Sequence, residues 1–267
     1  MKEIKEVNEI QQIALKILKY IDKICKENNI QYYLAYGTAL GAVRHGGFIP
    51  WDDDIDIMMT RDNYNKFLAI MDSINSKDFK CIYNYHNFFA KVVDTSTTLE
   101  EFNQINHPDM GVYVDIFPVD KMKDNITVKD IKKVYKYQML ATYALSKKFI
   151  KSNHGFLRTC VKFCVYLYSK LMGSKHWVKK FNKAATKLQN EETSLLGIYD
   201  DYPDTRAVFE KSTYENPTTI MFENYQFPIV KDYDKYLTQI YGDYMQLPPE
   251  EKRVTVHSFK AYKKEQD

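Results

Sequence analysis

The chain has 267 residues, of which 45% are hydrophobic and 27% are charged, and its formal net charge at pH 7 is +3. This length suits one catalytic core, alone or with a helical addition. Residues 1–7 are charged and contain no apolar signal core, and no run reaches the roughly 18 apolar residues that span a bilayer, so we expect a cytoplasmic protein.

The sequence contains four cysteines, Cys25, Cys81, Cys160 and Cys164. None of them forms a C-x-x-C pair, and a zinc site built on the last two would lack its other ligands. We therefore expect buried, reduced thiols.

Hydrophobic periodicity predicts an amphipathic helix over residues 3–28, because isoleucines recur there at helical spacing. A strand at 32–35 is expected to turn into a short helix, and a further helix is expected over 61–75. The remaining predicted elements are strands near 54–58, 79–84, 88–93 and 112–117, and a helical region over 127–190.

Residues 52–57 read Asp-Asp-Asp-Ile-Asp-Ile. In an extended chain Asp54 and Asp56 point to one face and the isoleucines between them point to the core, and Asp52 falls on the acidic face too. Carboxylates this close repel one another unless a cation compensates, and Mg²⁺, with Mn²⁺ as the alternative, is a hard ion that accepts such ligands. An ordinary acidic surface turn is the competing interpretation.

A glycine-containing turn precedes the acidic run. Gly37 and Thr38 stand between the predicted strand at 32–35 and its short helix, where backbone N–H groups and the Thr38 hydroxyl can hold a phosphate. The pattern matches neither a dinucleotide-binding fingerprint nor a P-loop. Its order, a Gly-Thr turn, a short helix and then Asp-x-Asp on the next strand, is the layout of a polymerase-β-like nucleotidyltransferase fold.

Such a fold needs a third carboxylate on a neighbouring strand. In residues 111–120 the aliphatic Val112, Val114 and Ile116 alternate with Tyr113 and Asp115. Asp115 would therefore face the other acids if the two strands pair, although a solvent-facing strand acid gives the same pattern. Asp120, beyond Pro118, is expected to be a cap or turn residue.

The stretch Gly-Thr-x-Leu-Gly-Ala-x-Arg-His-x-Gly-Phe-Ile-Pro-Trp-Asp-Asp-Asp-Ile-Asp within residues 32–57 resembles the LicD family of phosphotransferases, which is related to the fukutin group. The likeness continues at 89–94 and 113–118 and returns at 233–249, and the middle third of the chain matches weakly. The resemblance implies an α/β (α+β) fold with a nucleotidyltransferase-like mixed sheet flanked by helices. It also implies transfer of phosphocholine from CDP-choline to a cell-surface glycan precursor of the teichoic acid or lipopolysaccharide type, with release of CMP.

Several residues are candidates to bind the donor. Arg44 and Lys91 can neutralise a diphosphate, although each could be a surface ion pair instead, and His45 lies beside Arg44. Arg253 and His257 follow the Leu-Pro-Pro stretch and are expected to fold back on the site. Choline needs aromatic faces, and the aromatic residues nearest the motif are Tyr36, Trp51, Tyr113 and Phe117, any of which can equally belong to the core.

Charge is unevenly distributed along the chain. Residues 121–190 hold seventeen Lys or Arg against two acids, a local balance of +15, so the remainder carries about −12. A basic, mostly helical annex over 126–195 can hold anionic substrate, touch an anionic membrane or bind nucleic acid, and no nucleic-acid module supports the last. Within it, residues 156–172 suit a helix in a membrane interface or an ordinary buried helix whose lysines reach solvent.

These patterns divide the chain into a catalytic core at 1–125, the basic helical region at 126–195 and a C-terminal segment at 196–267 that packs back on the core. We expect the catalytic carboxylates to be Asp54, Asp56 and Asp115, with a lipid-linked acceptor and a peripheral place at the inner face of the membrane. Two alternatives remain: a nucleotidyltransferase that moves NMP from an NTP to a sugar, and a non-catalytic membrane-surface protein.

Overall fold

The computed structural model describes residues 1–84, 88–153, 155–199, 203–255 and 259–265. Its central feature is a mixed sheet in which five strands run side by side in the order β2-β3-β7-β5-β4, and only β3 and β7 are parallel. Two short strands, β8 and β9, extend the sheet from the far end of β7. The strands of this sheet are β2 (Tyr33–Leu34), β3 (Asp56–Thr60), β4 (Phe79–Ile82), β5 (Ala90–Asp94), β7 (Tyr113–Met122), β8 (Leu195–Gly197) and β9 (Val208–Glu210).

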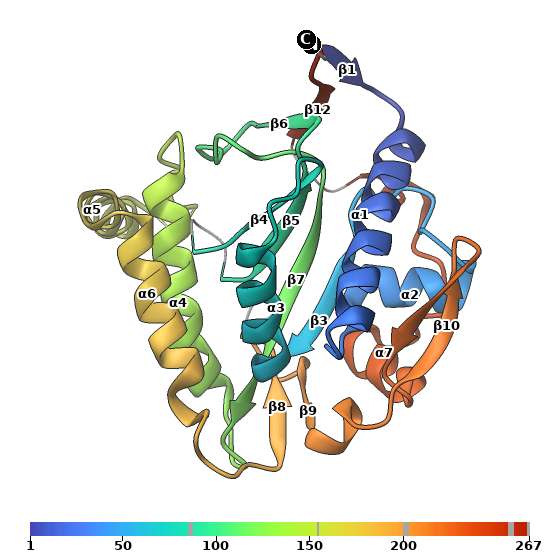
Figure 1. The fold of residues 1–267 in the computed structure, drawn as a ribbon. Coiled ribbons are helices and arrows are strands. Elements are labelled where there is room, and N and C mark those ends of the chain that lie inside the picture. Colours follow the sequence, from blue (N-terminus) through green and yellow to red (C-terminus); the bar gives the residue numbers. More distant parts are fainter. Residues whose placement is uncertain (85–87, 154, 200–202, 256–258, 266–267) are drawn as a thin grey trace.

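Helices flank this sheet, as Figure 1 shows. α1 and α3 pack across one face, α2 lies beside β3 and against α7, and α4 and α6 stand together at one side with α5 outermost. The α-helices are α1 (Val7–Glu27), α2 (Tyr36–His45), α3 (Arg61–Ser73), α4 (Val128–Leu145), α5 (Phe156–Met172), α6 (Ser174–Ala185) and α7 (Tyr233–Tyr241), and the short 3-10 turns are η1 (Thr186–Leu188), η2 (Lys211–Tyr214) and η3 (Glu250–Lys252).

Two smaller sheets complete the fold. β1 (Lys2–Ile4), β12 (Phe259–Lys263) and β6 (Thr97–Glu101) form an antiparallel sheet that joins both ends of the chain, and β10 (Thr218–Phe222) forms a hairpin with β11 (Tyr225–Ile229). The predicted start of the first helix was therefore wrong. Residues 2–4 pair with β12 instead, a long-range contact that helical periodicity cannot reveal, and α1 begins at Val7.

The apolar interior falls into two clusters. The larger one lies around the main sheet and draws residues from Ile4 to Ala261. The smaller one lies mainly among α4, α6 and Met122, with Trp177 and Phe181 at its centre. No helix within the described ranges is both long enough and apolar enough to cross a membrane.

Strand β7 runs through the predicted turn at Pro118. Pro118 lies between the last residue paired with β5, Ile116, and the first paired with β8, Asp120, so its missing N–H leaves no ladder bond unmade. The expectation that Asp120 caps a turn was therefore wrong. Asp120 lies inside the strand, 1% exposed, and accepts two bonds of 2.7 Å from the Arg61 guanidinium.

The expectation that the four cysteines are buried holds for Cys25 only. Cys25 is buried and Cys81 is half-buried, whereas Cys160 and Cys164 are exposed on α5. All four are free thiols. Burial raises the pKa of the Cys81 thiol to about 12 and raises that of Cys25 further, so both stay protonated near neutral pH.

Candidate active site

Three neighbouring strands place charged side chains in one row. Asp56 on β3 lies directly opposite Asp115 on β7, in parallel register, and Lys91 on β5 lies opposite Asp115 on the other side. The Asp115 N–H donates to the Ile55 carbonyl at 2.8 Å, which fixes that register. The predicted pairing of the two acidic strands is confirmed, and directly opposite residues share a face of the sheet.

The carboxylates gather tightly enough to share an ion. One oxygen each from Asp54, Asp56 and Asp115 lies within 4.8 Å of the others, and Asp52, Asp53 and Asp54 form a second such group. Asp54 is common to both groups, although it precedes β3 rather than belonging to it. Ile55 and Ile57 are fully buried beneath the row, as the alternation of the sequence predicted.

Asp53 is the residue that sequence reasoning missed. It is only 4% exposed, the most buried of the three consecutive aspartates. Alternation assigned the acidic face to Asp52, Asp54 and Asp56 and left Asp53 out. A run of three acids offers no periodic signal that would single out its middle member.

Gly37 lets the acidic loop approach the start of α2. A Cβ at this position would lie 2.8 Å from Asp52 Oδ2, so any larger residue would push the carboxylate away. Gln11 Nε2 on α1 donates to the Asp52 carbonyl at 2.7 Å and holds the same loop from the other side. The acidic loop therefore packs directly against the Gly-Thr turn.

Thr38 is committed to the acidic strand. Its hydroxyl oxygen accepts a 2.8 Å bond from the Asp56 N–H, and the residue is 4% exposed. The hydroxyl hydrogen remains able to donate to a phosphate. Thr38 thus links the turn to the position of Asp56.

Lys91 brings positive charge to the carboxylates. Its Nζ lies 2.5 Å from Asp115 Oδ1 and 3.4 Å from the centre of the Tyr113 ring. Both partners of the ion pair are almost fully buried. Burial, followed by the charges of Asp115, Asp54 and Asp53, raises the pKa of the Tyr113 phenol, which keeps it neutral beside this row.

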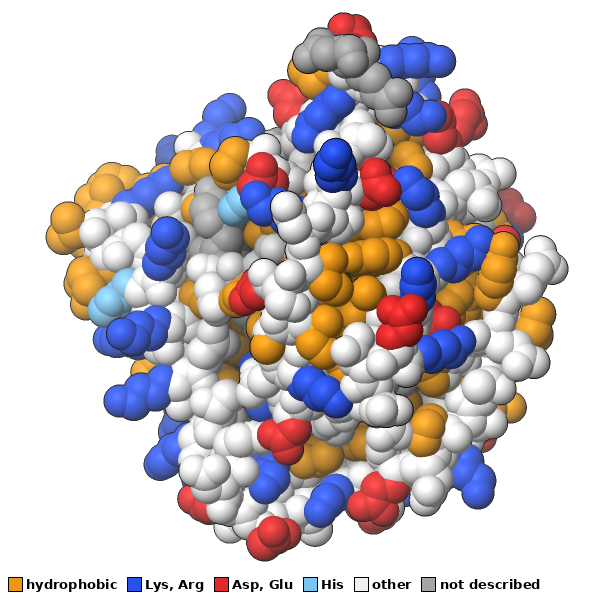
Figure 2. All heavy atoms as spheres, in the orientation of Figure 1, with side chains coloured by type: hydrophobic (Ala, Val, Ile, Leu, Met, Phe, Trp, Pro, Cys, Tyr) orange, Lys and Arg blue, Asp and Glu red, His pale blue; other side chains and the backbone are white. Residues whose placement is uncertain are grey.

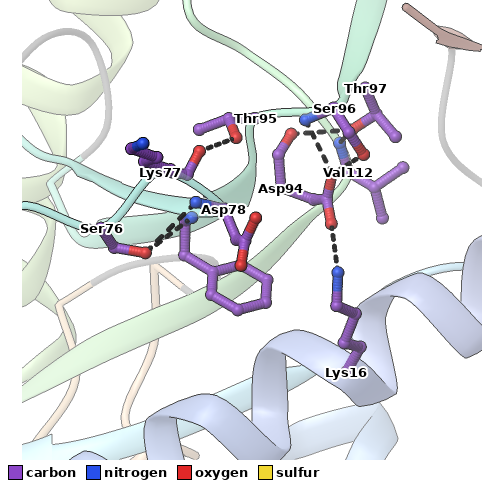
Figure 3. A network of polar contacts seen from close by, with 10 residues as sticks. Lys16, Ser76, Lys77, Asp78, Asp94, Thr95, Ser96, Thr97 and Val112 are labelled. Atoms are coloured by element: carbon purple, nitrogen blue, oxygen red, sulfur yellow. Dashed lines mark hydrogen bonds and ion pairs between the residues drawn. The ribbon is translucent and has the colours of Figure 1, made fainter. Parts of the chain in front are cut away.

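The strand that carries Lys91 ends in a structural turn, shown in Figure 3. The Asp94 carboxylate accepts from the N–H and hydroxyl of Ser96 and lies 3.7 Å from Lys16 Nζ on α1. The Thr97 hydroxyl donates to the Asp94 carbonyl and accepts from the Val112 N–H. These bonds join the end of β5 and the start of β6 to Val112, directly before β7.

Arg44 and His45 lie at the other end of α2, away from the Gly-Thr turn. Arg44 Nη1 donates to the Tyr244 carbonyl at 2.7 Å, and its Nε donates to His45 Nε2 at 3.0 Å. Partial burial and the Arg44 charge lower the pKa of His45, which suits an imidazole that accepts this bond. The structure does not bring these two side chains into the carboxylate row.

A pocket of about 430 Å³ opens beside this arginine. Its walls come from both ends of the sequence likeness, since Arg44 and Trp51 face Tyr241, Tyr244 and residues 246–249. The Arg253 guanidinium lies 5.9 Å from the Trp51 ring centre, next to this pocket. His257 lies outside the described residues.

Of the four aromatic residues nearest the motif, only Trp51 lines that pocket. Tyr36, Tyr113 and Phe117 are buried in the core cluster, which matches the alternative that they belong to the core rather than to a choline site. Tyr36 packs edge-on against Phe117 and begins α2 with a left-handed φ of +41°. A left-handed φ costs a non-glycine residue about 1 to 3 kcal/mol, and Tyr236, whose hydroxyl accepts the Tyr36 N–H, packs against this turn.

Comparison with known proteins agrees with the geometry. Residues 29–162, half of the chain, match the family described as LicD/FKTN/FKRP, nucleotidyltransferase domain. The chain belongs to this family. The matched segment contains the whole carboxylate row, the Gly-Thr turn and Lys91, together with α4 and the start of α5.

Individual relatives cover different shares of the chain. The chain is 28% identical to the lipopolysaccharide cholinephosphotransferase LicD of Haemophilus influenzae over 96% of its own length and 97% of that protein. It is 25% identical to the human ribitol 5-phosphate transferase FKRP over 38% of its length and 19% of that protein. An uncharacterised protein of Rickettsia typhi is 33% identical over 29% of the chain. The family match, together with the similarity to LicD over nearly the whole chain, identifies a transferase of the LicD family.

Proposed function

We propose that this protein transfers phosphocholine from CDP-choline to a hydroxyl group of a cell-surface glycan precursor. The acceptor oxygen forms a bond to the phosphorus that bears choline, the bond from that phosphorus to the bridging oxygen breaks, and CMP leaves with the bridging oxygen. The hydroxyl proton passes to a carboxylate or to water. The observation that carries the proposal is the row Asp56, Asp115 and Lys91 across β3, β7 and β5, in a chain related to LicD over nearly its whole length.

The donor set fits a hard divalent cation. Asp54, Asp56 and Asp115 offer carboxylate oxygens within 4.8 Å of one another, and such oxygens are the ligands that Mg²⁺ and Mn²⁺ prefer. A bound Mg²⁺ would supply charge neutralisation at the diphosphate and at the departing CMP. The chain itself orients Asp56 through Thr38 and holds Asp115 through Lys91.

The rest of the donor has two regions available. The start of α2 at Gly37 and Thr38 presents N–H groups and one hydroxyl hydrogen toward anionic oxygens. Trp51, directly before the acidic loop, offers an aromatic face in the 430 Å³ pocket, which suits a quaternary ammonium or a base. Arg44 and Arg253 line or adjoin that pocket, so we assign them to the donor's outer part rather than to its reacting phosphorus.

Calorimetric titration tests the proposal. CDP-choline and CTP are titrated into the wild-type protein and into Asp56→Asn, each with and without Mg²⁺. We expect Mg²⁺-dependent binding that favours CDP-choline and disappears in the variant. A preference for CTP would instead identify nucleotidyl transfer, and an active, metal-independent Asp56→Asn protein would refute the assignment.

Product analysis separates the two chemistries directly. Phosphocholine transfer releases CMP, whereas nucleotidyl transfer releases pyrophosphate.

We further propose a lipid-linked acceptor and a three-part chain with boundaries near residues 125 and 195. Incubation of CDP-choline with lipid-extracted and with soluble glycan precursors shows which class of acceptor gains phosphocholine.

A further inference from the structure

Helix α5 turns its apolar side away from the protein. Ser169 is its one buried residue, while Phe156, Leu157 and Leu171 are 85%, 77% and 83% exposed. The other large apolar side chains exposed on this helix are Val161, Phe163, Leu167 and Tyr168. The alternative of an ordinary buried helix at 156–172 was therefore wrong.

Ser169 and Lys170 of α5 point the other way, toward the protein. Ser169 donates to the Val165 carbonyl within α5, and its own carbonyl accepts from Trp177 Nε1 on α6. Lys170 Nζ donates to the Ser146 carbonyl at 2.6 Å, just beyond the end of α4. A surface helix in water normally shows the reverse pattern, with its apolar stripe against the core. An apolar face of this extent usually marks an interaction site.

The surroundings of this face are basic. Residues 131–190 contain fourteen Lys or Arg and no Asp or Glu. Lys148, Lys151 and Arg158 are exposed on α5 or directly before it, and Lys175 is exposed just after it. Figure 2 shows apolar side chains gathered at the edge of the molecule where α5 lies in Figure 1, with basic side chains beside them.

We propose that the outer face of α5 docks on an anionic membrane surface, with the helix lying in the plane of the headgroups. The exposed apolar side chains enter the boundary between headgroups and acyl chains, and the neighbouring cations meet the lipid phosphates. Charge complementarity favours lipid over a second copy of the chain, since a second copy would bring the same acid-free segment against the first. This docking does not depend on the proposed reaction.

Vesicle flotation of the full-length protein tests the docking. Vesicles of phosphatidylcholine alone are compared with vesicles of equal parts phosphatidylcholine and phosphatidylglycerol. We expect binding to the anionic vesicles that weakens as salt rises. Leu157→Glu and Leu171→Glu should each lower vesicle affinity roughly tenfold, whereas Met221→Glu on β10, which is 46% exposed, should leave it unchanged.

Two further measurements keep the proposal falsifiable if a leucine variant folds poorly. Arg158→Gln should bind anionic vesicles more weakly and with a smaller salt dependence. A polarity-sensitive dye on the exposed thiols Cys160 and Cys164 should shift its emission to shorter wavelength when anionic vesicles are added. Equal binding to both vesicle types, no dye shift, or a dimer that the leucine variants dissociate without any vesicle binding would each overturn the proposal.

Discussion

Strand β7 carries two buried ion pairs, one on Asp120 and one on Asp115, and their surroundings differ. Asp120 meets Arg61 through two 2.7 Å bonds, so one cation matches one anion. Asp115 meets Lys91 through one 2.5 Å bond, and one of its oxygens also lies within 4.8 Å of oxygens of Asp54 and Asp56. The first pair joins one anion to one cation, whereas the second belongs to a group of carboxylates that could hold a metal ion.

Alternation along the strand separates these pairs. Asp115 and Asp120 are five residues apart, so they point to opposite faces of the sheet. Asp120 points toward Arg61 at the start of α3, on the face that helices cover. The difference teaches that burial alone does not separate an acid in a single ion pair from an acid in a carboxylate group, since Asp115 and Asp120 are both almost fully buried.

The largest effect is expected at the matched pair. Asp120→Asn leaves the buried Arg61 guanidinium without its anion, and we expect the free energy of unfolding in urea to fall by about 3 to 5 kcal/mol. The control is Asp204→Asn, which removes an exposed Asp–Arg pair of 3.0 Å and should cost at most about 1 kcal/mol. Equal losses for the two variants would contradict the structural role of Asp120.

The pair beside the other carboxylates should show a different behaviour. Asp115→Asn breaks the buried pair with Lys91 but also lowers the repulsion among carboxylates that lie within 4.8 Å, so we expect the urea midpoint to fall less than in Asp120→Asn. Turnover of CDP-choline should fall about 10²- to 10³-fold, the range for loss of one preorganised charged group. Asp78→Asn, an exposed aspartate before β4, is the control and should leave both quantities unchanged. A stable, fully active Asp115→Asn protein would remove Asp115 from the site.

Lys91 tests what its ammonium contributes to the carboxylate group. Lys91→Met removes the buried cation that pairs with Asp115, so we expect lower stability, with part of the loss restored by Mg²⁺ or salt. Turnover should fall roughly 10- to 100-fold, as for residues that orient metal ligands. Lys91→Arg keeps the charge and should retain most of the stability. If Mg²⁺ stabilises Lys91→Met no more than it stabilises the wild type, the ammonium does not compensate the carboxylates.

Alternation of buried and polar side chains along β3 and β7 was enough to predict part of this site from the sequence. Asp56 and Asp115 were found because each interrupts a run of buried aliphatic residues, and the structure pairs their strands. Asp120 was misread because Pro118, two residues earlier, suggested a turn. The strand continues because Pro118 lies between the residues of β7 that pair with β5 and those that pair with β8. Hydrophobic periodicity also could not predict that the apolar face of α5 is exposed. Periodicity shows that a helix has an apolar side and a polar side, but not which of them packs against the protein.

The smallest effect is expected at Thr38, which connects the turn to the carboxylate row. Thr38→Val keeps the shape of the side chain but removes the acceptor of the Asp56 N–H, a bond of 2.8 Å, and a lost bond of this kind costs about 1 kcal/mol. We expect a loss of stability of that size, measured by urea denaturation, and a modest fall in turnover as Asp56 shifts. Thr38→Ser keeps the hydroxyl and serves as the control.

The same pair of variants decides between two roles for the hydroxyl. If Thr38 only positions Asp56, Thr38→Val should weaken Mg²⁺ binding and CDP-choline binding together, because both depend on the carboxylate row. If the hydroxyl hydrogen also reaches a phosphate, the variant should lose CDP-choline affinity even where Mg²⁺ affinity is unchanged. Calorimetry with each ligand therefore separates an oriented strand from a phosphate contact, and Thr38→Ser should match the wild type in both titrations.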